Sequence, residues 1–388
     1  MSERPVIRLK AERAPQHPWV YSNSVEKPEQ RLPPGSIVEI VDRVGTWCGR
    51  GFYNGHARIA LRILTRDRGE AVEEGFFQQR LQHAVALRHD VLKLEGNTDA
   101  YRVVNSEGDG LSGLVVDRLG NTIVYEYFSA GMWRQRELIH RTFEQVFPGS
   151  QHYWFAETHV AKQESFDCRT PDAPTPSIIR EHGLQFHVAP GSAHKTGFFV
   201  DQRDNRLQLS ELCADRDVLD LCCNSGGFAI YASARGKARS VTAVDIDAGV
   251  LELARRNAEL NAASVEFIAA DMFAWFAQAH ARDTRYDVVV LDPPKLTRNA
   301  EQIIQALKKY QEINRLALGL VRPGGIFLTC SCTGLISEVQ FLETLRRAAF
   351  FANRNVQVLT VSGAGPDHPF SVNVPEGRYL KAVLCRVT

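Results

Sequence analysis

One stretch of the sequence decides the fold: VLDLCCNSGGF, residues 218–228. Residues 218–221 are mostly apolar and predict a short buried strand. A loop with two glycines, Gly226 and Gly227, separates this strand from an apolar helical segment that starts at Phe228. Because glycine has no side chain, such a loop lets the backbone approach a bound ligand closely. The stretch therefore predicts the first strand–loop–helix unit of a sheet that holds a ligand at its strand ends.

The sequence after this unit keeps alternating strands and helices. Further apolar strands are predicted at residues 241–244, 265–268, 287–291 and 326–329. A helix is predicted at 248–260, with Asp247 as its N-cap. Near-continuous apolar runs of this kind suit a parallel sheet that is covered on both faces. We therefore expect a doubly wound, Rossmann-like α/β domain, and we assign residues 186–388 to it.

The sequence before the alternating part is organised differently. Residues 1–70 hold short β segments broken by turn residues, with strands predicted at 36–41 and 59–64. They indicate a small β-rich domain. Residues 71–185 combine further strands with helical patterns and indicate a central α+β domain.

Two helical patterns are predicted in this central part, at residues 76–94 and 134–147. The apolar residues of the first pattern share one stripe at helical spacing. Arg80 and Arg88 fall outside that stripe, so the pattern places both arginines away from the buried face.

Composition and charge limit the classes of function. The 388 residues contain 44% hydrophobic and 23% charged residues, which is typical of a soluble, core-forming protein. The formal net charge is only +1, so a nucleic-acid partner would need a local basic patch. A basic edge at Arg62, Arg66 and Arg68 is the candidate patch in the first domain.

The cysteines and the N-terminus indicate a cellular setting. None of the eight cysteines forms a CxxC pair or a zinc-type spacing, so we expect no metal and free thiols. Free thiols favour a reducing, cytoplasmic location. We see no apolar secretory segment near the N-terminus and no run long enough to span a bilayer, and we expect no membrane partner.

Acidic residues follow successive predicted strands. Asp245 ends the second strand, where a carboxylate can accept hydrogen bonds from ribose hydroxyls. Asp271 lies just after the third strand, where it can face an adenine ring, and Asp292 ends the fourth in the tetrapeptide Asp-Pro-Pro-Lys. The glycine loop alone would also suit a nicotinamide dehydrogenase. The complete set resembles the class I methyltransferases, which implies S-adenosylmethionine as the cofactor and contacts to it from Asp220, Asn224, Ser225, Gly226, Asp245, Asp271 and Asp292.

The tetrapeptide at 292–295 and the stretch TCSCT at 329–333 indicate the reaction. Similar tetrapeptides grip a planar base, but Lys295 stands where amino-nitrogen methyltransferases carry an aromatic residue. A cysteine beside such a base suits pyrimidine C5 chemistry, because thiolate addition at C6 makes C5 nucleophilic. Strand alternation puts Cys330 and Cys332 on the same face, so geometry leaves both thiols as candidates, and two packed core cysteines are the alternative.

Five sequence blocks carry a closer resemblance that covers essentially the whole chain. They are HKTGFFVDQR at 194–203, NSGGF at 224–228, DPPK at 292–295, SCTGL at 331–335, and DHP at 367–369 with PEGRYLK at 375–381. Together they resemble the large-subunit ribosomal RNA cytosine-C5 methyltransferases of the RlmI type. The resemblance implies an N-terminal PUA-like RNA-binding domain, a central domain and a C-terminal methyltransferase domain.

The resemblance also implies roles for single residues. Cys332 matches the nucleophile of the family, and Asp292 matches an acidic position of the catalytic site. Gln202 matches a position near the cofactor, and Lys195 and Lys295 are the expected substrate contacts. The implied partner is 23S ribosomal RNA, and a homodimer is compatible with the sequence.

Three alternatives stay open at this point. Uridine-C5 methyltransferases also pair an Asp-Pro-Pro block with one later cysteine, so the residues do not choose between cytosine and uridine. An RNA-binding protein that keeps the fold without catalysis is a second alternative. A small-molecule methyltransferase is the third, and it leaves the first 185 residues without a role.

Overall fold

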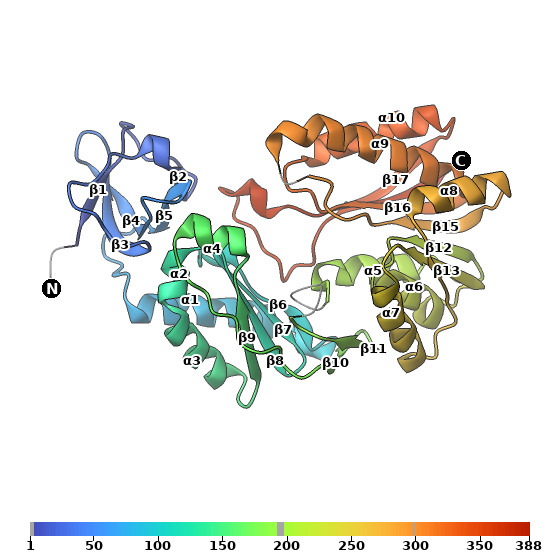
Figure 1. Ribbon diagram of the computed structural model, residues 1–388, viewed down its shortest axis with the longest axis horizontal. Helices are drawn as coiled ribbons and strands as arrows, with labels where there is room; N and C mark the ends of the chain where they lie inside the picture. Colours follow the sequence, from blue (N-terminus) through green and yellow to red (C-terminus); the bar gives the residue numbers. More distant parts are fainter. Residues whose placement is uncertain (1–3, 192–197, 298) are drawn as a thin grey trace. The chain divides into compact units, whose positions relative to one another are not determined.

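The computed structural model describes residues 4–191, 198–297 and 299–388 and divides the chain into two compact units (Figure 1). Unit 1 consists of Met1–Ser177, Val188–Phe198 and Pro366–Gly377. Unit 2 consists of Ile178–His187, Phe199–Gly365 and Arg378–Thr388. The chain therefore passes from one unit to the other more than once, and short late segments complete units that begin much earlier.

The first part of unit 1 is a five-stranded sheet in the order β1-β3-β4-β5-β2. Its strands are β1 (Val6–Arg8), β2 (Trp19–Tyr21), β3 (Ser36–Val41), β4 (Trp47–Tyr53) and β5 (Ile59–Thr65). The strands predicted at 36–41 and 59–64 are confirmed. A core of aliphatic side chains that includes Val38, Ile40 and Leu61 holds the sheet together.

The basic edge predicted for this part is wrong at Arg62. Its side chain is buried, and Nη2 lies 3.1 Å from Oε1 of Glu164, because β5 is buried on both faces from Ala60 to Thr65. Arg66 and Arg68 follow at the exposed end of the strand, and Arg68 lies over the ring of Trp47. Only these two arginines of the predicted edge are therefore open to a partner.

The second part of unit 1 is a four-stranded sheet in the order β6-β7-β8-β9, packed against helices. Its strands are β6 (Ala100–Asn105), β7 (Leu114–Leu119), β8 (Thr122–Tyr127) and β9 (Gln151–Phe155). Its helices are α1 (Glu74–Ala86), α2 (Ala130–Arg134), α3 (Arg136–Val146) and α4 (Thr158–Glu164). The helix predicted at 76–94 is wrong beyond Ala86, where a π-helical turn (Leu87–Val91) replaces the α-helix.

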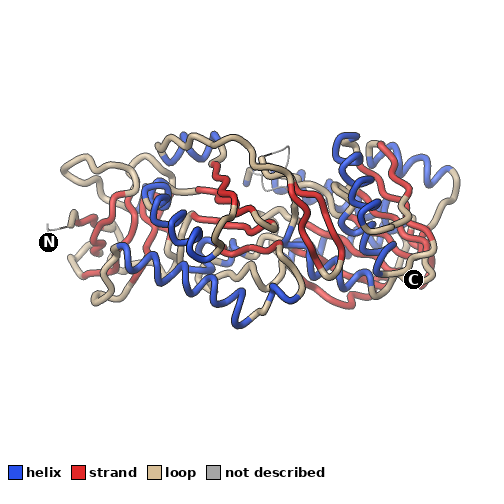
Figure 2. Tube along the Cα trace, turned by 90° about the horizontal axis from the view of Figure 1, so that it is seen from below, coloured by secondary structure: helices blue, strands red, loops and turns tan. Residues whose placement is uncertain are grey.

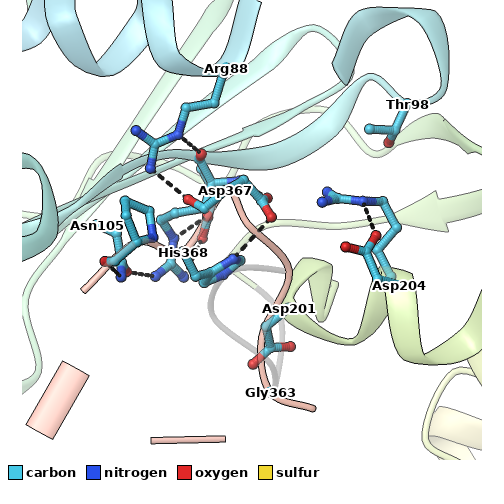
Figure 3. A network of polar contacts seen from close by, with 12 residues as sticks. Arg88, Thr98, Asn105, Asp201, Asp204, Gly363, Asp367 and His368 are labelled. Carbon is cyan, nitrogen blue, oxygen red and sulfur yellow. Dashed lines mark hydrogen bonds and ion pairs between the residues drawn. The ribbon is translucent and has the colours of Figure 1, made fainter. Parts of the chain in front are cut away.

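That π-helical turn buries Arg88, which the sequence pattern placed outside the apolar stripe. The side chain is fully buried, and its two terminal nitrogens lie 2.6 and 3.0 Å from the carboxylate oxygens of Asp109. Arg88 Nη2 also donates to the backbone oxygen of Asp367 at 2.5 Å, and the Asp367 carboxylate accepts from the Arg102 amide (Figure 3). The Pro366–Gly377 segment is therefore locked into the early part of the chain by buried polar contacts.

Unit 2 is built on a seven-stranded sheet in the order β14-β13-β12-β15-β16-β18-β17. All neighbouring strands from β14 to β16 pair in parallel, and β18 pairs antiparallel with both β16 and β17. The strands are β12 (Asp217–Leu221), β13 (Ser240–Asp245), β14 (Glu266–Ala269), β15 (Tyr286–Leu291), β16 (Val321–Ser331), β17 (Val356–Ser362) and β18 (Lys381–Val387). A separate hairpin is formed by β10 (Ser177–Glu181) and β11 (Leu184–Val188).

Helices cover both faces of this sheet, as the near-continuous apolar strands predict (Figures 1 and 2). Side chains of α5, α6 and α7 pack on one face, in a core with Val218 and Val288. Side chains of α8, α9 and α10 pack on the other face, in a core with Leu219 and Val289. The helices are α5 (Arg203–Ser210), α6 (Gly227–Ile230), α7 (Ala248–Leu260), α8 (Met272–Ala281), α9 (Ile303–Gly319) and α10 (Glu338–Phe351). Within the described ranges, no helix combines the length and the apolar character that crossing a bilayer requires.

Candidate active site

The strand order of unit 2 reverses direction at β12, which defines where a ligand can bind. β12 pairs in parallel with β13 on one side and with β15 on the other, so the connections from these strands leave in opposite directions. In doubly wound sheets the crevice outside the carboxyl ends of such strands is the ligand site. Nearly all of the predicted site residues follow β12, β13, β14, β15 or β16, so the fold brings them to one edge.

The loop after β12 has a backbone that few residue types adopt. Cys222, Asn224 and Gly226 have positive φ angles of 61°, 48° and 84°. The Asn224 side chain accepts a hydrogen bond from the Ser225 amide at 2.8 Å, which stabilises its left-handed conformation. The Asn224 amide donates to Oδ2 of Asp245 at 2.9 Å. The loop is therefore tied to the end of β13.

Asp220 is a buried carboxylate on β12. Its Oδ2 accepts a hydrogen bond from the Ala229 amide at 3.0 Å, and its Oδ1 is buried with no hydrogen-bond partner among the described residues. Burial raises the pKa of Asp220 well above its usual range, and the charges of Asp292 and Asp245 raise it further. The neighbouring carboxylates of Asp292 and Asp245 therefore oppose ionisation of Asp220, and a positively charged ligand would relieve this repulsion.

Two further aspartates start helices at these strand ends. Asp247 caps α7 and Asp271 caps α8, each by accepting hydrogen bonds from two backbone amides, so the predicted N-cap is confirmed. The cap bonds of Asp271 use Oδ1. Ile246 follows Asp245 directly and Phe273 comes two residues after Asp271, and their side chains are 72% and 40% exposed. Exposed apolar side chains beside polar acceptors suit a ligand with a flat apolar face, which the sequence reading missed.

Asp292 follows β15 directly and accepts a hydrogen bond from Gln202. Gln202 is buried, its Nε2 lies 3.0 Å from Oδ2 of Asp292, and its Oε1 accepts from the Asn205 side chain at 2.6 Å. Burial raises the pKa of Asp292 to about 7, with a further contribution from the charge of Asp201. Asp201, another residue that the sequence reading missed, accepts a hydrogen bond from the Tyr379 hydroxyl at 2.7 Å. Asp292 is thus poised to exchange a proton near neutral pH.

The two candidate cysteines differ in their surroundings. Cys330 lies within β16, is fully buried and packs in an apolar cluster. Cys332 lies just after the end of β16 and is only partly buried. The pKa of Cys332 is raised to about 11, mainly by burial and in part by the charges of Asp292 and Asp201. The charge of Lys295 acts in the opposite direction. Cys332 is therefore the more accessible thiol, and in the free protein it is protonated at neutral pH.

The turn that follows Cys332 is held by several elements. Thr333 is fully buried, and its Oγ1 lies 2.9 Å from the Tyr310 hydroxyl and accepts from the Leu296 amide at 3.3 Å. Its backbone oxygen accepts from Nζ of Lys381 at 2.7 Å. Lys295 is exposed, directly before Leu296. Lys195, the other predicted substrate contact, lies outside the described residues.

Comparison with known proteins gives consistent results. A family model for S-adenosylmethionine-dependent methyltransferases matches residues 113–377, and a PUA-like domain model matches residues 10–66. Ribosomal RNA large subunit methyltransferase I of Klebsiella pneumoniae (strain 342) is 38% identical over 381 residues, which are 96% of this chain and 94% of that protein. The protein of the same name from Pseudoalteromonas atlantica is 37% identical over 378 residues, or 96% and 95% of the two chains.

A solved structure shares the fold. The crystal structure of SMU.776, described as a methyltransferase in complex with S-adenosylhomocysteine, superposes with a TM-score of 0.81 at 20% identity. The superposition covers 99% of this chain and 100% of the other. The predicted doubly wound fold, the PUA-like domain and the family resemblance are confirmed. The chain belongs to the family of S-adenosylmethionine-dependent methyltransferases that includes ribosomal RNA large subunit methyltransferase I.

Proposed function

We propose that the protein methylates C5 of a cytosine in large-subunit ribosomal RNA, through a covalent bond between Cys332 and C6 of the base. The observation that carries this proposal is the pair at the ends of β15 and β16: a partly buried thiol, and a carboxyl group whose pKa is raised to about 7. Relatives named ribosomal RNA large subunit methyltransferase I support the substrate class.

The residues at the strand ends fit the cofactor. S-adenosylmethionine, when bound, supplies an electrophilic methyl group on a sulfonium centre. Its sulfonium and ammonium charges suit the buried carboxylate of Asp220 and the neighbouring Asp245, whereas the anionic pyrophosphate of a nicotinamide dinucleotide does not. The orphaned Oδ1 of Asp220 is one acceptor for a cationic group, within the part of the chain that the structure describes.

The remaining predicted contacts divide between two parts of the cofactor. We assign Asp245 to the ribose hydroxyls, and Asp271 with Ile246 and Phe273 to the adenine ring, because polar acceptors and exposed apolar faces meet there. Asn224, Ser225 and Gly226 form the loop beside the methionine moiety. Gln202 holds Asp292 in place between the cofactor side and the base side of the site.

The thiol of Cys332 starts the reaction. It must lose its proton, because only the thiolate is a nucleophile, and its sulfur then forms a bond to C6 of the pyrimidine. The electron pair of the C5–C6 double bond shifts toward N3 and O2 as the S–C6 bond forms, which makes C5 enamine-like and able to take the methyl group. Loss of the C5 proton to a base and cleavage of the S–C6 bond then restore the aromatic ring and the thiolate.

Asp292 favours cytosine over uridine. As sulfur adds to C6, negative charge develops on N3 and O2, and a protonated carboxyl beside N3 stabilises that charge. Cytosine N3 is a hydrogen-bond acceptor, whereas uridine N3 carries a hydrogen and needs an acceptor. With a pKa of about 7, Asp292 retains a proton in a large fraction of molecules at neutral pH and can serve as that donor.

The rest of the chain suits an RNA substrate. We propose that residues 1–70 bind RNA, that 71–185 form the central domain, and that 186–388 form the catalytic domain. Arg66 and Arg68 are exposed in the PUA-like part and suit phosphate contacts. Lys295, the last residue of the tetrapeptide at 292–295, is exposed and suits the phosphate or base of the target nucleotide. A base in a paired stem must leave its stack to reach this site.

The test is covalent trapping. RNA that carries 5-fluorocytidine at the target cannot lose a proton from C5, so the Cys332–C6 bond should persist as an adduct detectable by mass spectrometry. Nucleoside analysis of methylated ribosomal RNA should show 5-methylcytosine. A 5-methyluridine product would show that the target base is uridine and not cytosine. RNA binding without methyl transfer or adduct would overturn the proposal that the protein is a catalyst.

A further inference from the structure

Lys381 is a buried cation that the proposed reaction does not yet use. It is the first residue of β18, only 1% exposed, and directly opposite Ser331 in the antiparallel pairing with β16. Lysine is almost never buried this completely without compensation, because desolvating an ammonium group is costly. Its Nζ donates to the backbone oxygens of Thr333 at 2.7 Å and Tyr379 at 2.8 Å.

These two hydrogen bonds fix the turn beside the reactive cysteine. Thr333 follows Cys332 directly, so the Lys381 bond to its carbonyl orients the backbone next to the thiol. The Thr333 side chain is held independently by the Tyr310 hydroxyl and by the Leu296 amide. Lys381 is thus the one cation among the described contacts of a turn that otherwise depends on neutral hydrogen bonds.

The charged groups around Cys332 act on its thiolate in opposite directions. Asp292 and Asp201 oppose formation of the thiolate, while Lys295 favours it from the exposed side. The pKa of Lys381 is lowered to about 8, mainly by burial and in part by the charge of Lys295. The charges of Cys332 and Glu338 act in the opposite direction. Glu338 is itself paired with Arg378, with 2.6 Å between Oε2 and Nη2. Nζ of Lys381 contacts the backbone oxygen of Thr333, the residue directly after Cys332, so its charge is held next to the turn that carries the thiol.

We propose that Lys381 is a positioning residue for Cys332, which fixes the peptide after the cysteine and stabilises the thiolate by a positive charge that water does not screen. This inference rests on the proposed role of Cys332 as the nucleophile. The ammonium group does not touch the base, and its effect passes through the thiol. A buried charge acts more strongly on a neighbour than an exposed one at similar distance, because the local dielectric is lower.

The experiment measures the reactivity of Cys332 without RNA or cofactor. Iodoacetamide reacts only with the thiolate, whose sulfur forms a bond to carbon while iodide leaves with the bonding electron pair. The rate of Cys332 alkylation is followed by mass spectrometry of its peptide between pH 6.5 and 8.5 for the wild type, Lys381→Gln, Lys381→Met and Lys381→Arg. Glutamine keeps a donor for the carbonyls but removes the charge, and arginine keeps the charge.

The expected result separates charge from packing. Lys381→Gln and Lys381→Met should slow Cys332 alkylation about tenfold at pH 6.5, which corresponds to a rise of about one pKa unit in the thiol. The difference should narrow toward pH 8.5, because Lys381 of the wild type, whose pKa is lowered to about 8, then loses its charge. Lys381→Arg should stay within about threefold of the wild type. If Lys381→Met does not fold, the glutamine variant alone decides the matter. Equal or faster alkylation of Cys332 in a folded, uncharged variant overturns the proposal.

Two controls exclude a general loosening of the strand. Arg386→Met removes an exposed charge from the same strand, β18, and should leave Cys332 alkylation unchanged. Cys385, fully buried on β18, should stay protected in every variant, because its alkylation reports local opening. Protection of Cys385 together with slower Cys332 alkylation supports the proposal. Alkylation of Cys385 and Cys332 at equally altered rates contradicts it.

The outcome is distinguishable from failure of the proposed function. If the wild type forms no adduct with 5-fluorocytidine RNA but the alkylation pattern holds, the proposed reaction fails while the placement of Lys381 stands. If the adduct forms in the wild type at the same rate as in Lys381→Gln, the reaction stands and the role of Lys381 fails.

Discussion

Buried charges are treated in opposite ways in unit 1 and at the strand ends of unit 2. In unit 1, Arg88 faces Asp109, Arg102 faces Asp117, and Arg62 faces Glu164, each within 3.1 Å of an opposite charge. At the strand ends of unit 2, Asp220 and Asp292 instead lie near other carboxylates, and their nearest described hydrogen-bond donors are an amide of the backbone and the neutral side chain of Gln202. The buried charges of unit 1 are paired with opposite charges, as expected for groups that hold a fold together. The carboxylates at the strand ends of unit 2 lack such a pairing, as expected for groups that await a ligand.

The largest expected effect tests the chemical side of this comparison. Cys332→Ala should reduce methyl transfer by at least about 10³-fold, because the proposed bond to C6 is formed by its sulfur. Its melting temperature should stay close to that of the wild type. Methylation is measured by transfer of labelled methyl groups to ribosomal RNA, with Cys48→Ala, a partly exposed thiol of unit 1, as the matched control. Residual turnover within tenfold of the wild type would remove Cys332 from the mechanism.

The next effect tests the structural side. Arg88→Met should lower the free energy of unfolding by about 3–5 kcal/mol, because it leaves the Asp109 carboxylate buried without its partner. Urea unfolding followed by tryptophan fluorescence is the measurement. It reports mainly on unit 1, which holds four of the five tryptophans: Trp19, Trp47, Trp133 and Trp154.

Arg80→Met is the control for that experiment, since Arg80 lies on α1, directly before the turn that carries Arg88, and its ion pair with Glu70 is partly exposed. Arg80→Met should lower the free energy of unfolding by about 1 kcal/mol or less. Equal decreases in Arg80→Met and Arg88→Met would mean that burial of the Arg88–Asp109 pair adds nothing to stability.

A substitution of Asp292 should have a smaller effect on the free energy of unfolding, and it should stabilise the fold where Arg88→Met destabilises it. The pKa of Asp292 is raised to about 7 in the folded protein and is near 4 when unfolded, so ionisation weakens the fold as pH rises between these values. Asp292→Asn should therefore be more stable than the wild type by about 1–2 kcal/mol at pH 8, with no difference near pH 4. Melting temperatures across this range are the measurement. Methyl transfer by the variant should nevertheless fall about 10²-fold.

Asp217→Asn is the matched control at the opposite edge of the sheet, at the start of β12. Hydrogen bonds from Arg239 lower the pKa of Asp217, with help from Arg322, so its ionised form stabilises the fold above the unfolded pKa. This variant should be less stable than the wild type at pH 8 and should approach it as the pH falls. The same sign for both variants would contradict the contrast between the two edges of the sheet.

The smallest effect separates two helix caps. Asp247→Ala and Asp271→Ala should each lower stability by about 1 kcal/mol, because each removes a carboxylate that caps a helix. Only Asp271→Ala should also weaken S-adenosylmethionine binding, by about tenfold, through the lost acceptor for adenine. Isothermal titration measures both affinities. Equal affinities in the two variants would assign Asp271 to the helix alone.

Local patterns of the sequence predict much of unit 2. The apolar strands from Val218 to Thr329, the glycine loop and the cap at Asp247 follow from composition and spacing over a few residues. Acids after successive parallel strands necessarily converge, so the carboxylate group near Asp220 could be expected before any coordinates. The sequence did not distinguish Cys330 from Cys332, because the difference lies in where β16 ends.

Contacts between distant parts of the chain could not be predicted in the same way. Lys381 occurs in a motif near the end of the chain, but its place opposite Ser331 depends on β18 inserting between β16 and β17. Arg88 looks like a surface residue by helical spacing, since nothing nearby shows that Asp367 will cover it. Polar residues whose partners are far away in the sequence give no periodic signal, and burial of their charge is therefore missed.

The late segment Pro366–Gly377 has a consequence for how the protein is made. Arg88 and Asp367, which join in unit 1, are separated by 279 residues, so synthesis at 5–20 residues per second delays their contact by roughly 15–60 s. During that interval the nascent unit 1 exposes a polar seam that only the segment Pro366–Gly377 can close. Quality control that samples nascent chains would therefore see unit 1 as unfinished until this segment has been made, and a product truncated before it would carry its defect far from the missing end.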